Sequence, residues 1–450
     1  MTTASKVPIV AIIGRANVGK SSLFNALLKR RQAIVATEAG TTRDSVTAKL
    51  SLEQGDAWLV DTAGLKDATD NFELTIQAQI AEAAAAADLI LVVIEAAALT
   101  DEDRRVATLA LKTGRLVILV ANKLDQAGKA DRAQWAKLGI KQIVGTSTTQ
   151  KRGLGDLLAA LQAQLPPVKA KPAAGQLRLA LLGRPNVGKS SLFNALANKP
   201  QALVAERAGT TRDVNELSIT YQGEDIVLMD TAGIRRAGKV GTGVEHFSVL
   251  RALAAIEQAD IGLLLLDAAE PAVAQDQKIA GLLKQAGRGL IIVVNKIDLV
   301  KADQRDRLAE RVAAAYRFTP WAPLVLISTT TGQNVAKLLE LASQIDQGRR
   351  QLIPTPELNR WLGQVVADHP PAGLGGKQPH LNYIIQEADH PLNFKLFGKD
   401  SRSLHWSYKR YLERRFREHW PFTGLPLSFW FFDKAVHNKD HGAVSEKTNH

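Results

Sequence analysis

The sequence contains no cysteine, and only 5% of its residues are aromatic. The missing cysteines exclude disulfide bonds and thiolate metal ligands, and their absence fits a reducing cytoplasm. Long apolar runs are missing too, although a membrane-spanning helix needs about 20 apolar residues in succession. Residues 1–6 show no signal-peptide pattern. We therefore expect a cytoplasmic protein that acts without a membrane.

Acidic residues are in the minority, with 45 Asp and Glu against 57 Lys and Arg, which gives a net charge of +12. This excess favours a polyanionic partner, and nucleic acid before an anionic membrane. A generic basic protein without such a partner is the alternative. The length of 450 residues suggests about three domains.

A phosphate-binding motif occurs twice, 169 residues apart, and both copies fit the P-loop pattern G-x-x-x-x-G-K-[ST]. The copies consist of Gly14, Arg15, Ala16, Asn17, Val18, Gly19, Lys20 and Ser21, and of Gly183, Arg184, Pro185, Asn186, Val187, Gly188, Lys189 and Ser190. Glycines let backbone N–H groups approach phosphate oxygens, and the following helix directs its positive end at them. Lys20 and Lys189 are expected at the β- and γ-phosphates, and Ser21 and Ser190 on Mg²⁺. The repeat thus predicts two nucleoside triphosphate sites.

Two switch motifs follow each P-loop in the same order. Thr42 and Thr211, in Ala-Gly-Thr-Thr-Arg-Asp, are expected to meet Mg²⁺ in the triphosphate state. The second motif consists of Asp61, Thr62, Ala63, Gly64 and then Leu65, and of Asp230, Thr231, Ala232, Gly233 and then Ile234. Its Asp is expected to hold Mg²⁺ through water, and its Gly to offer an N–H to the γ-phosphate. Loss of that phosphate would release both segments.

A guanine-reading motif completes each set. It consists of Asn122, Lys123, Leu124 and Asp125, and of Asn295, Lys296, Ile297 and Asp298. A carboxylate accepts both N1–H and the exocyclic amine of guanine, an arrangement that adenine lacks, so Asp125 and Asp298 are expected to select the base. The Asn residues would orient the loop or bind the base edge, and the Lys stems would cover the ring.

Short apolar runs place these motifs at the ends of buried strands. The runs are Val7–Gly14, Ala57–Asp61, Leu89–Ile94, Leu116–Lys123 and Gln142–Ser147, then Leu177–Gly183, Ile226–Asp230, Ile261–Asp267, Leu290–Lys296 and Leu324–Ser328. Helical stretches such as Ser21–Lys29 and Phe247–Gln258 lie between them. This alternation predicts two mostly parallel, doubly wound α/β sheets that bind ligands at the carboxyl ends of their strands.

Composition sets the expected boundaries. Residues 166–175 read as a Pro-, Ala- and Lys-rich linker between domains at 1–165 and 176–348. A third domain is expected at 349–436, because residues 351–450 hold 14 of the 24 aromatic residues, and a polar tail at 437–450. Leu404–His419 reads as an amphipathic basic helix. Such a helix suits RNA phosphates, and an ordinary solvated face is the alternative.

With these motifs in order, the chain resembles the Der (EngA) family of bacterial GTPases over nearly its whole length. Further resemblance lies in Gly238-Lys239-Val240, His369-Pro370-Pro371 and Ser407-Tyr408-Lys409-Arg410-Tyr411-Leu412. The resemblance implies two P-loop GTPase domains and a C-terminal α+β KH-like domain. It also implies hydrolysis of GTP to GDP and assembly of the large ribosomal subunit through its rRNA, by a monomer.

The chain departs from the family at the first P-loop, where Ala16 replaces the usual Pro, and at the guanine-backing Ser-Ala. The latter appears as Ser147-Thr148 and Ser328-Thr329, where Thr loses the tighter fit of Ala. Leu65 and Ile234 stand where Ras-like enzymes place the water-orienting Gln, so we expect slow intrinsic hydrolysis. The resemblance suggests that Asn17 and Asn186 help to bind an activating K⁺; the alternative is that they only cap the loop.

Other functional classes stay open. A membrane-associated GTPase is disfavoured by the lack of an amphipathic membrane helix or a lipidation signal. An RNA-binding scaffold with one inert site is disfavoured because both copies keep every motif. Gly373-Leu374-Gly375-Gly376 fits the G-x-x-G loop of KH domains, but it does not follow a helical run and is interpreted as a turn.

Overall fold

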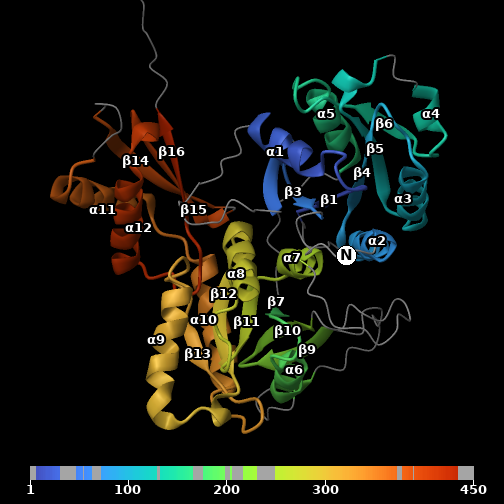
Figure 1. Cartoon of the computed structure of the whole chain (residues 1–450). Helices are drawn as coiled ribbons and strands as arrows, with labels where there is room; N and C mark the ends of the chain where they lie inside the picture. The colour runs from blue at the N-terminus through green and yellow to red at the C-terminus, as the bar shows by residue number, and fades with distance from the viewer. Residues whose placement is uncertain are drawn as a thin grey trace, which may run out of the picture. The chain divides into compact units, whose positions relative to one another are not determined.

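The computed structural model describes residues 7–30, 47–53, 55–62, 72–128, 132–165, 176–197, 203–204, 216–230, 249–371, 378–388 and 390–433. The chain divides into two compact units, Met1–Ser343 and Gln344–His450 (Figure 1). The first unit contains both repeats. The predicted linker 166–175 and the predicted tail 437–450 lie outside the described residues, as does the Gly373–Gly376 segment.

The first repeat is built on a mostly parallel sheet in the order β2-β3-β1-β4-β5-β6. The strands are β1 (Ile9–Ile13), β2 (Thr47–Leu52), β3 (Gly55–Asp61), β4 (Leu89–Glu95), β5 (Leu116–Asn122) and β6 (Gln142–Gly145). Only β2 runs antiparallel to its neighbour among these described strands. The central strands read as continuous apolar runs because helices cover both faces.

The second repeat has the same strand order with one short strand added at the edge, β13-β12-β11-β7-β10-β9-β8. Its strands are β7 (Leu177–Leu182), β8 (Leu203–Val204), β9 (Glu216–Tyr221), β10 (Glu224–Asp230), β11 (Ile261–Asp267), β12 (Gly289–Asn295) and β13 (Leu324–Leu326). The predicted α/β class with doubly wound sheets is therefore confirmed for both repeats.

Helices follow the strands in turn. They are α1 (Lys20–Arg30), α2 (Phe72–Ala86), α3 (Asp101–Lys112), α4 (Arg132–Ala136) and α5 (Leu154–Gln164), then α6 (Lys189–Ala197), α7 (Val249–Gln258), α8 (Ala274–Ala286), α9 (Arg305–Ala315) and α10 (Ala336–Arg350). Short 3₁₀ turns lie at Leu124–Gln126, Ile297–Leu299 and Ala302–Gln304. None of the helices in the described ranges is long and apolar enough to cross a membrane.

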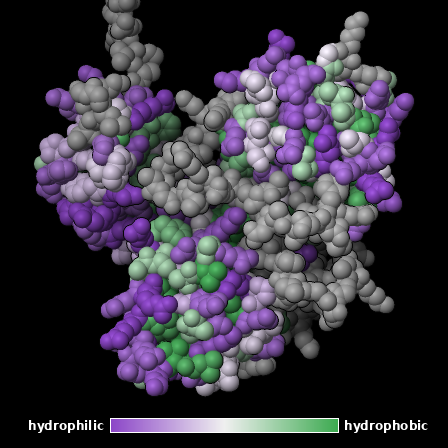
Figure 2. Space-filling model, viewed as in Figure 1, coloured by the Kyte–Doolittle hydropathy of each residue, from purple (hydrophilic) through white to green (hydrophobic). Residues whose placement is uncertain are grey.

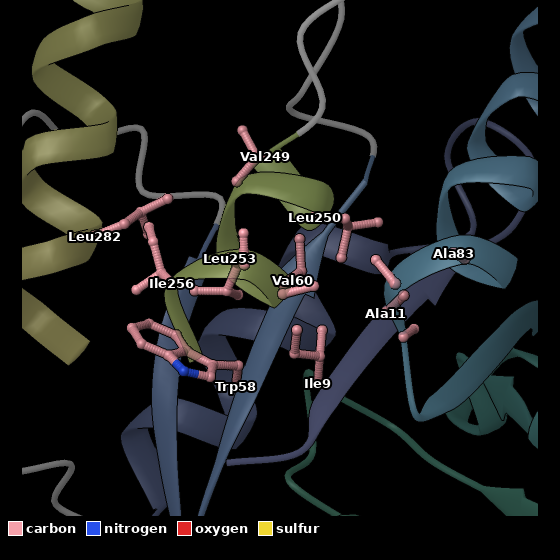
Figure 3. Packing of buried hydrophobic residues seen from close by; sticks show 14 of the residues in the cluster. Ile9, Ala11, Trp58, Val60, Ala83, Val249, Leu250, Leu253, Ile256 and Leu282 are labelled. Carbon is pink, nitrogen blue, oxygen red and sulfur yellow. The ribbon is translucent and has the colours of Figure 1, made fainter. Parts of the chain in front are cut away.

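Alternation along β1 assigns its side chains to two separate cores. Val10 and Ile12 are buried with Leu23 of α1 and Leu157 of α5. Ile9, Ala11 and Ile13 point the other way, into a cluster that includes α2 and α3. That second cluster does not stop at the first repeat, because it continues into α7 of the second (Figure 3).

The C-terminal unit combines two helices with a three-stranded sheet in the order β14-β15-β16. Its elements are α11 (Thr355–Asp368), β14 (His380–Glu387), β15 (His390–Lys399), a 3₁₀ turn at Ser401–Ser403, α12 (Trp406–His419) and β16 (Ser428–Asp433). Phe416 of α12 lies at the centre of its core, with ring centroids 4.6 Å from Phe394 and 5.2 Å from Trp361. The predicted basic helix is α12, and His405 caps it by accepting the N–H of Ser407.

Replacing Phe416 with Ala should lower the free energy of unfolding of the C-terminal unit by about 3–5 kcal/mol, because it leaves a cavity among packed rings. Urea unfolding of the full chain, followed by near-ultraviolet circular dichroism, measures the effect. Trp406→Ala is the matched control on the same helix. Trp406 is 60% exposed, so its loss should change the stability by less than about 0.5 kcal/mol. Equal effects of the two substitutions would contradict this packing.

Candidate nucleotide sites

In the first repeat the P-loop joins the end of β1 to the start of α1. Its two glycines have no room for a side chain: a Cβ on Gly14 would lie 2.4 Å from the carbonyl oxygen of Val93, and one on Gly19 would lie 2.4 Å from Nδ2 of Asn122. Gly19 also has a φ of +94°, which other residues rarely adopt. The glycines are needed because the loop lies directly against β4 and β5.

The second P-loop repeats these contacts between β7 and α6. A Cβ on Gly183 would lie 2.4 Å from the carbonyl oxygen of Leu265, and one on Gly188 would lie 2.3 Å from Nδ2 of Asn295. The two loops therefore share one local geometry, in which each lies against the equivalent pair of strands of its own sheet.

Each P-loop lysine is folded back across its own loop. Nζ of Lys20 donates to the carbonyl oxygens of Gly14, at 2.8 Å, and Arg15, at 2.7 Å. Lys189 makes the same pair of bonds at 3.0 and 2.7 Å. Burial lowers the pKa of Lys20, against the opposing field of Asp61. An ammonium group has three donors, so these two bonds aim the lysine while the third is the one we expect to meet a phosphate oxygen.

Two of the three predicted Mg²⁺ ligands of the first repeat, Ser21 and Asp61, lie together. Oγ of Ser21 donates to Oδ2 of Asp61 at 2.5 Å, which joins the first turn of α1 to the end of β3. Thr62, next in the chain, is held by a 2.7 Å bond from its hydroxyl to the carbonyl oxygen of Ile12. A hydroxyl and a carboxylate at this distance suit a hard cation that prefers oxygen ligands.

In the second repeat, Asp230 ends β10 beside Leu181, so its backbone has the place of Asp61. Several predicted residues lie outside the described parts of the chain: Thr42, Ala63, Gly64, Leu65, Thr211, Thr231, Ala232, Gly233 and Ile234. The side chain of Asp230 is not described either. The expected roles of these switch residues stay predictions.

The buried Asn of each guanine motif ties the base-reading strand to the phosphate loop. Nδ2 of Asn122 donates to the carbonyl oxygen of Val18 at 3.0 Å, and Nδ2 of Asn295 donates to that of Val187 at 2.9 Å. Both Asn side chains are fully buried. Of the two roles open from the sequence, these contacts favour orientation of the loop.

The aspartate expected to read guanine is already oriented in the first repeat. Oγ of Ser147 donates to Oδ1 of Asp125 at 2.5 Å, and the same Oγ accepts the N–H of Gln150. In the second repeat, Oγ of Ser328 accepts the N–H of Thr331, so the local turn is repeated. The N–H of Thr329 donates to Oδ1 of Asn295 at 3.1 Å. We expect the same N–H to face O6 of a bound guanine.

Comparisons with known proteins agree with this geometry. A family model described as "50S ribosome-binding GTPase" matches residues 9–123 and 178–296, and one described as "KH-domain-like of EngA bacterial GTPase enzymes, C-terminal" matches residues 352–431. GTPase Der of Chloroflexus aggregans is 42% identical over 437 residues, which cover 94% of this chain and 97% of the relative. GTPase Der of Thermomicrobium roseum is 39% identical over 444 residues, covering 95% and 96%.

The chain belongs to the Der (EngA) family of GTPases. Membership confirms the predicted enzyme class and the KH-like nature of the C-terminal unit. The two repeats are thus the two GTPase domains of the family, and GTP and GDP are the nucleotides that their sites handle.

Two acidic positions around these sites were not predicted from the motifs. Glu95 ends β4 and Asp267 ends β11, and each pairs with the Lys of the guanine motif: Lys123 at 3.4 Å and Lys296 at 2.6 Å. Burial alone would raise the pKa of Asp267, but hydrogen bonds from Lys296 and from the N–H of Ala269, together with the positive charges of Lys296 and Arg184, lower that pKa on balance. Lys123 and Lys296 also have left-handed backbones, with φ of 60° and 67°. The sequence signal was an acid at the end of the same strand in both repeats.

A second unpredicted pair holds the P-loop arginines. Nε of Arg15 lies 3.3 Å from Asp103, and Nε of Arg184 lies 2.8 Å from Asp276. Both carboxylates are almost wholly buried. Burial raises the pKa of Asp276, and the adjacent guanidinium opposes this rise. A buried acid with an arginine partner fixes the outer half of each phosphate loop.

Gly188→Ala should weaken nucleotide binding at the second site on the order of 100-fold, because the added methyl group displaces the loop or Asn295 by about 1 Å. Titration with a fluorescent GDP analogue should then find one tight site in place of two. Gly281→Ala is the control, since a Cβ there meets nothing within 4 Å. Two tight sites in Gly188→Ala would disprove the steric argument.

Proposed function

We propose that this GTPase assists assembly of the large ribosomal subunit in the cytoplasm, as a monomer whose nucleotide state sets its affinity for rRNA. The single observation behind this is the pairing of two GTPase domains with a KH-like unit that carries a basic, aromatic helix. The descriptions of the matching family models point the same way. The domain limits 1–165, 176–348 and 349–436 belong to this proposal.

The proposed roles at each site follow the motif positions and, for the residues that the structure describes, the contacts given above. Lys20 and Lys189 bind the β- and γ-phosphates, and Asp125 and Asp298 read guanine. Mg²⁺ is held by Ser21, Thr42 and Asp61 in the first domain and by Ser190, Thr211 and Asp230 in the second, and when bound it neutralises phosphate charge. Gly64 and Gly233 report the γ-phosphate. Leu65 and Ile234 cannot orient a water by hydrogen bonding, which makes intrinsic hydrolysis slow.

Asn17 and Asn186 carry the proposed K⁺ activation. Both are exposed and both have a φ of 64°, a left-handed conformation that Asn tolerates better than most residues. The backbone alone could therefore explain their presence, so a test must separate conformation from side chain.

Asn186→Gly makes that separation, because Gly keeps the positive φ and removes the side-chain oxygen. The hydrolysis rate of the second domain should be higher in K⁺ than in Na⁺ for the unsubstituted chain, and equal in the two salts for Asn186→Gly. Nucleotide affinity should be unchanged in that variant. A K⁺ response that survives Asn186→Gly would leave the Asn with only its conformational role.

The proposed RNA surface is the outer face of α12. The guanidinium of Arg410 lies 4.8 Å from the exposed Trp406 ring, and that of Arg414 lies 5.9 Å from the Tyr411 ring. Figure 2 shows predominantly hydrophilic residues over this part of the C-terminal unit. Aromatic rings and guanidinium planes stack on unpaired bases, and the positive charges meet phosphates.

Arg417, which the sequence places with these basic residues, has another role. Its guanidinium pairs with Glu413 at 2.9 Å and donates to the carbonyl oxygen of Leu425 at 3.1 Å. Burial lowers its pKa, and only 14% of its side chain is exposed. Arg417 therefore stabilises the unit and is not part of the proposed RNA surface.

Co-sedimentation with ribosomal particles tests the proposal in three states: GTP analogue, GDP and no nucleotide. We expect binding to large subunits to differ between these states, and Arg410→Gln to weaken it about 5- to 10-fold by loss of a stacked cation. Arg360→Gln removes the same charge from an exposed position on α11 and should have a smaller effect. Binding that ignores the nucleotide would refute the switch, and binding to liposomes in place of ribosomes would support a membrane GTPase.

A further inference from the structure

Helix α7 is buried on nearly every side. Its buried residues are Val249, Leu250, Ala252, Leu253, Ala254, Ala255, Ile256 and Glu257. A helix that covers one sheet needs to bury only a single stripe, so a helix that is buried on nearly every side has a second body packed against it. Here the first body is its own domain, through β7 and α8, and the second is the first GTPase domain.

The first domain receives α7 on the sheet face of β1 and β3. Figure 3 shows Leu250 and Leu253 of α7 beside Val60 and Ile9, and Ile256 beside Trp58. All six side chains are fully buried and belong to one hydrophobic cluster. The second domain cannot offer the same face, because Arg178 stands at the position of Ile9 and pairs with Glu216.

A buried carboxylate fixes the position of α7 between the domains. Glu257 is 4% exposed and has one oxygen bound to each side. Nε1 of Trp58 donates to its Oε1 at 2.5 Å, and the guanidinium of Arg288 lies 3.0 Å from its Oε2. Lys49 lies over the Trp58 ring at 5.2 Å, and burial lowers the pKa of this lysine. A buried charge that loses a partner is strongly disfavoured, so sliding of α7 is opposed.

Neither member of the Trp58–Glu257 pair has a counterpart in the other domain. Asp88 and Asp260 occupy equivalent positions. Asp88 accepts the N–H of Ile9 in β1 at 2.8 Å, and Asp260 accepts the N–H of Arg178 in β7 at 2.9 Å. Three positions before them stand Ala85 in the first domain and Glu257 in the second. Trp58 corresponds to Val227 at the repeat offset of 169. The contact is therefore specific to this interface and is not a shared feature of the GTPase fold.

Both helices at this interface follow the γ-phosphate motifs. Residues 231–248 join Asp230 to α7, and residues 63–71 join Thr62 to α2. The two helices contact each other, and Ala83 of α2 lies in the same buried cluster as Leu250 of α7 (Figure 3). Each nucleotide-sensing segment thus leads directly into one half of a common core.

We propose that α7 couples the two GTP sites, so that the nucleotide in the second domain alters the affinity of the first through the Trp58–Glu257 contact and the α2–α7 packing. This inference rests on the proposed nucleotide switch. Because coupling of binding free energies is reciprocal, occupancy of the first site changes the second by the same factor.

The test loads the two sites separately. In an Asp298→Asn background the Asn amide donates to the C2 carbonyl of xanthine, so the second site takes xanthosine nucleotides and the first keeps guanine. A fluorescent GDP analogue then reports the affinity of the first site with XDP, with a non-hydrolysable XTP analogue, or with no ligand in the second. We expect at least about a fivefold difference between the XDP and XTP-analogue states.

Trp58→Phe keeps a buried aromatic ring but removes the donor to Glu257, together with the five-membered ring that carries it. It should bring the ratio between the XDP and XTP-analogue states close to one. Glu257→Gln tests the same bond from the other side, and its amide can still meet Trp58 or Arg288, so it should retain part of the coupling. Trp135→Phe makes the identical change at a buried Trp of α4 in the first domain and should leave the ratio unaltered.

The outcomes separate this inference from the proposed function. The coupling through α7 would be overturned if both sites bind nucleotide in the Asp298→Asn chain but the affinity of the first site is the same with XDP and with the XTP analogue. It would also be overturned if Trp58→Phe does not lower the ratio of these two affinities. Either result would leave the GTP-dependent assembly role intact. Failure of the second site to bind any nucleotide would overturn both.

Discussion

A single buried amide in each domain holds the nucleotide site together. Asn122 and Asn295 end the strands that carry the guanine motif, yet their side chains donate to carbonyl oxygens of the phosphate loops. The loop can approach only because Gly19 and Gly188 lack a Cβ, which would collide with the same amide. One buried hydrogen bond in each domain therefore joins the phosphate loop to the strand that carries the guanine motif, and an unmade bond there would be costly.

Around this contact, acidic side chains hold the cationic side chains of the site in position. Glu95 and Asp267 hold the lysines of the guanine motif, and the buried Asp103 and Asp276 hold the P-loop arginines. A triphosphate brings several negative charges into this region, so the site must keep cations oriented when it is free of nucleotide. Carboxylates on β4, β11, α3 and α8 pair with these lysines and arginines and so keep them oriented.

The repeats are alike at their sites and unlike where they meet. The first domain presents Ile9, Trp58 and Val60, whereas the second has Arg178, Val227 and Met229 at the same positions. Only one of the two switch-following helices, α7, is therefore shared by both domains. A duplicated sequence has become an asymmetric pair, in which one domain contributes a helix to the core of the other.

Much of the fold follows from sequence patterns. Each apolar run in the repeats coincides with a strand, because strands buried on both faces need continuous apolar residues. Apolar runs do not predict the strands β2 and β9, because these strands are partly exposed and mix polar with apolar residues. In the C-terminal unit, helix α12 is visible from its period, but the bond of Arg417 to Leu425 is not, and charge alone groups that arginine with the exposed ones.

The sequence by itself determined the two GTP sites, because their chemistry depends on local spacing: glycines, a lysine and a serine within eight positions, and an aspartate three residues after an asparagine. Tertiary structure alone decided which acids support those sites and which helix joins the domains. Trp58 and Glu257 are 199 positions apart, and no local pattern distinguishes a tryptophan that meets a carboxylate from one that fills a core. Such pairs exist only after two sheets have folded and one helix has been buried between them.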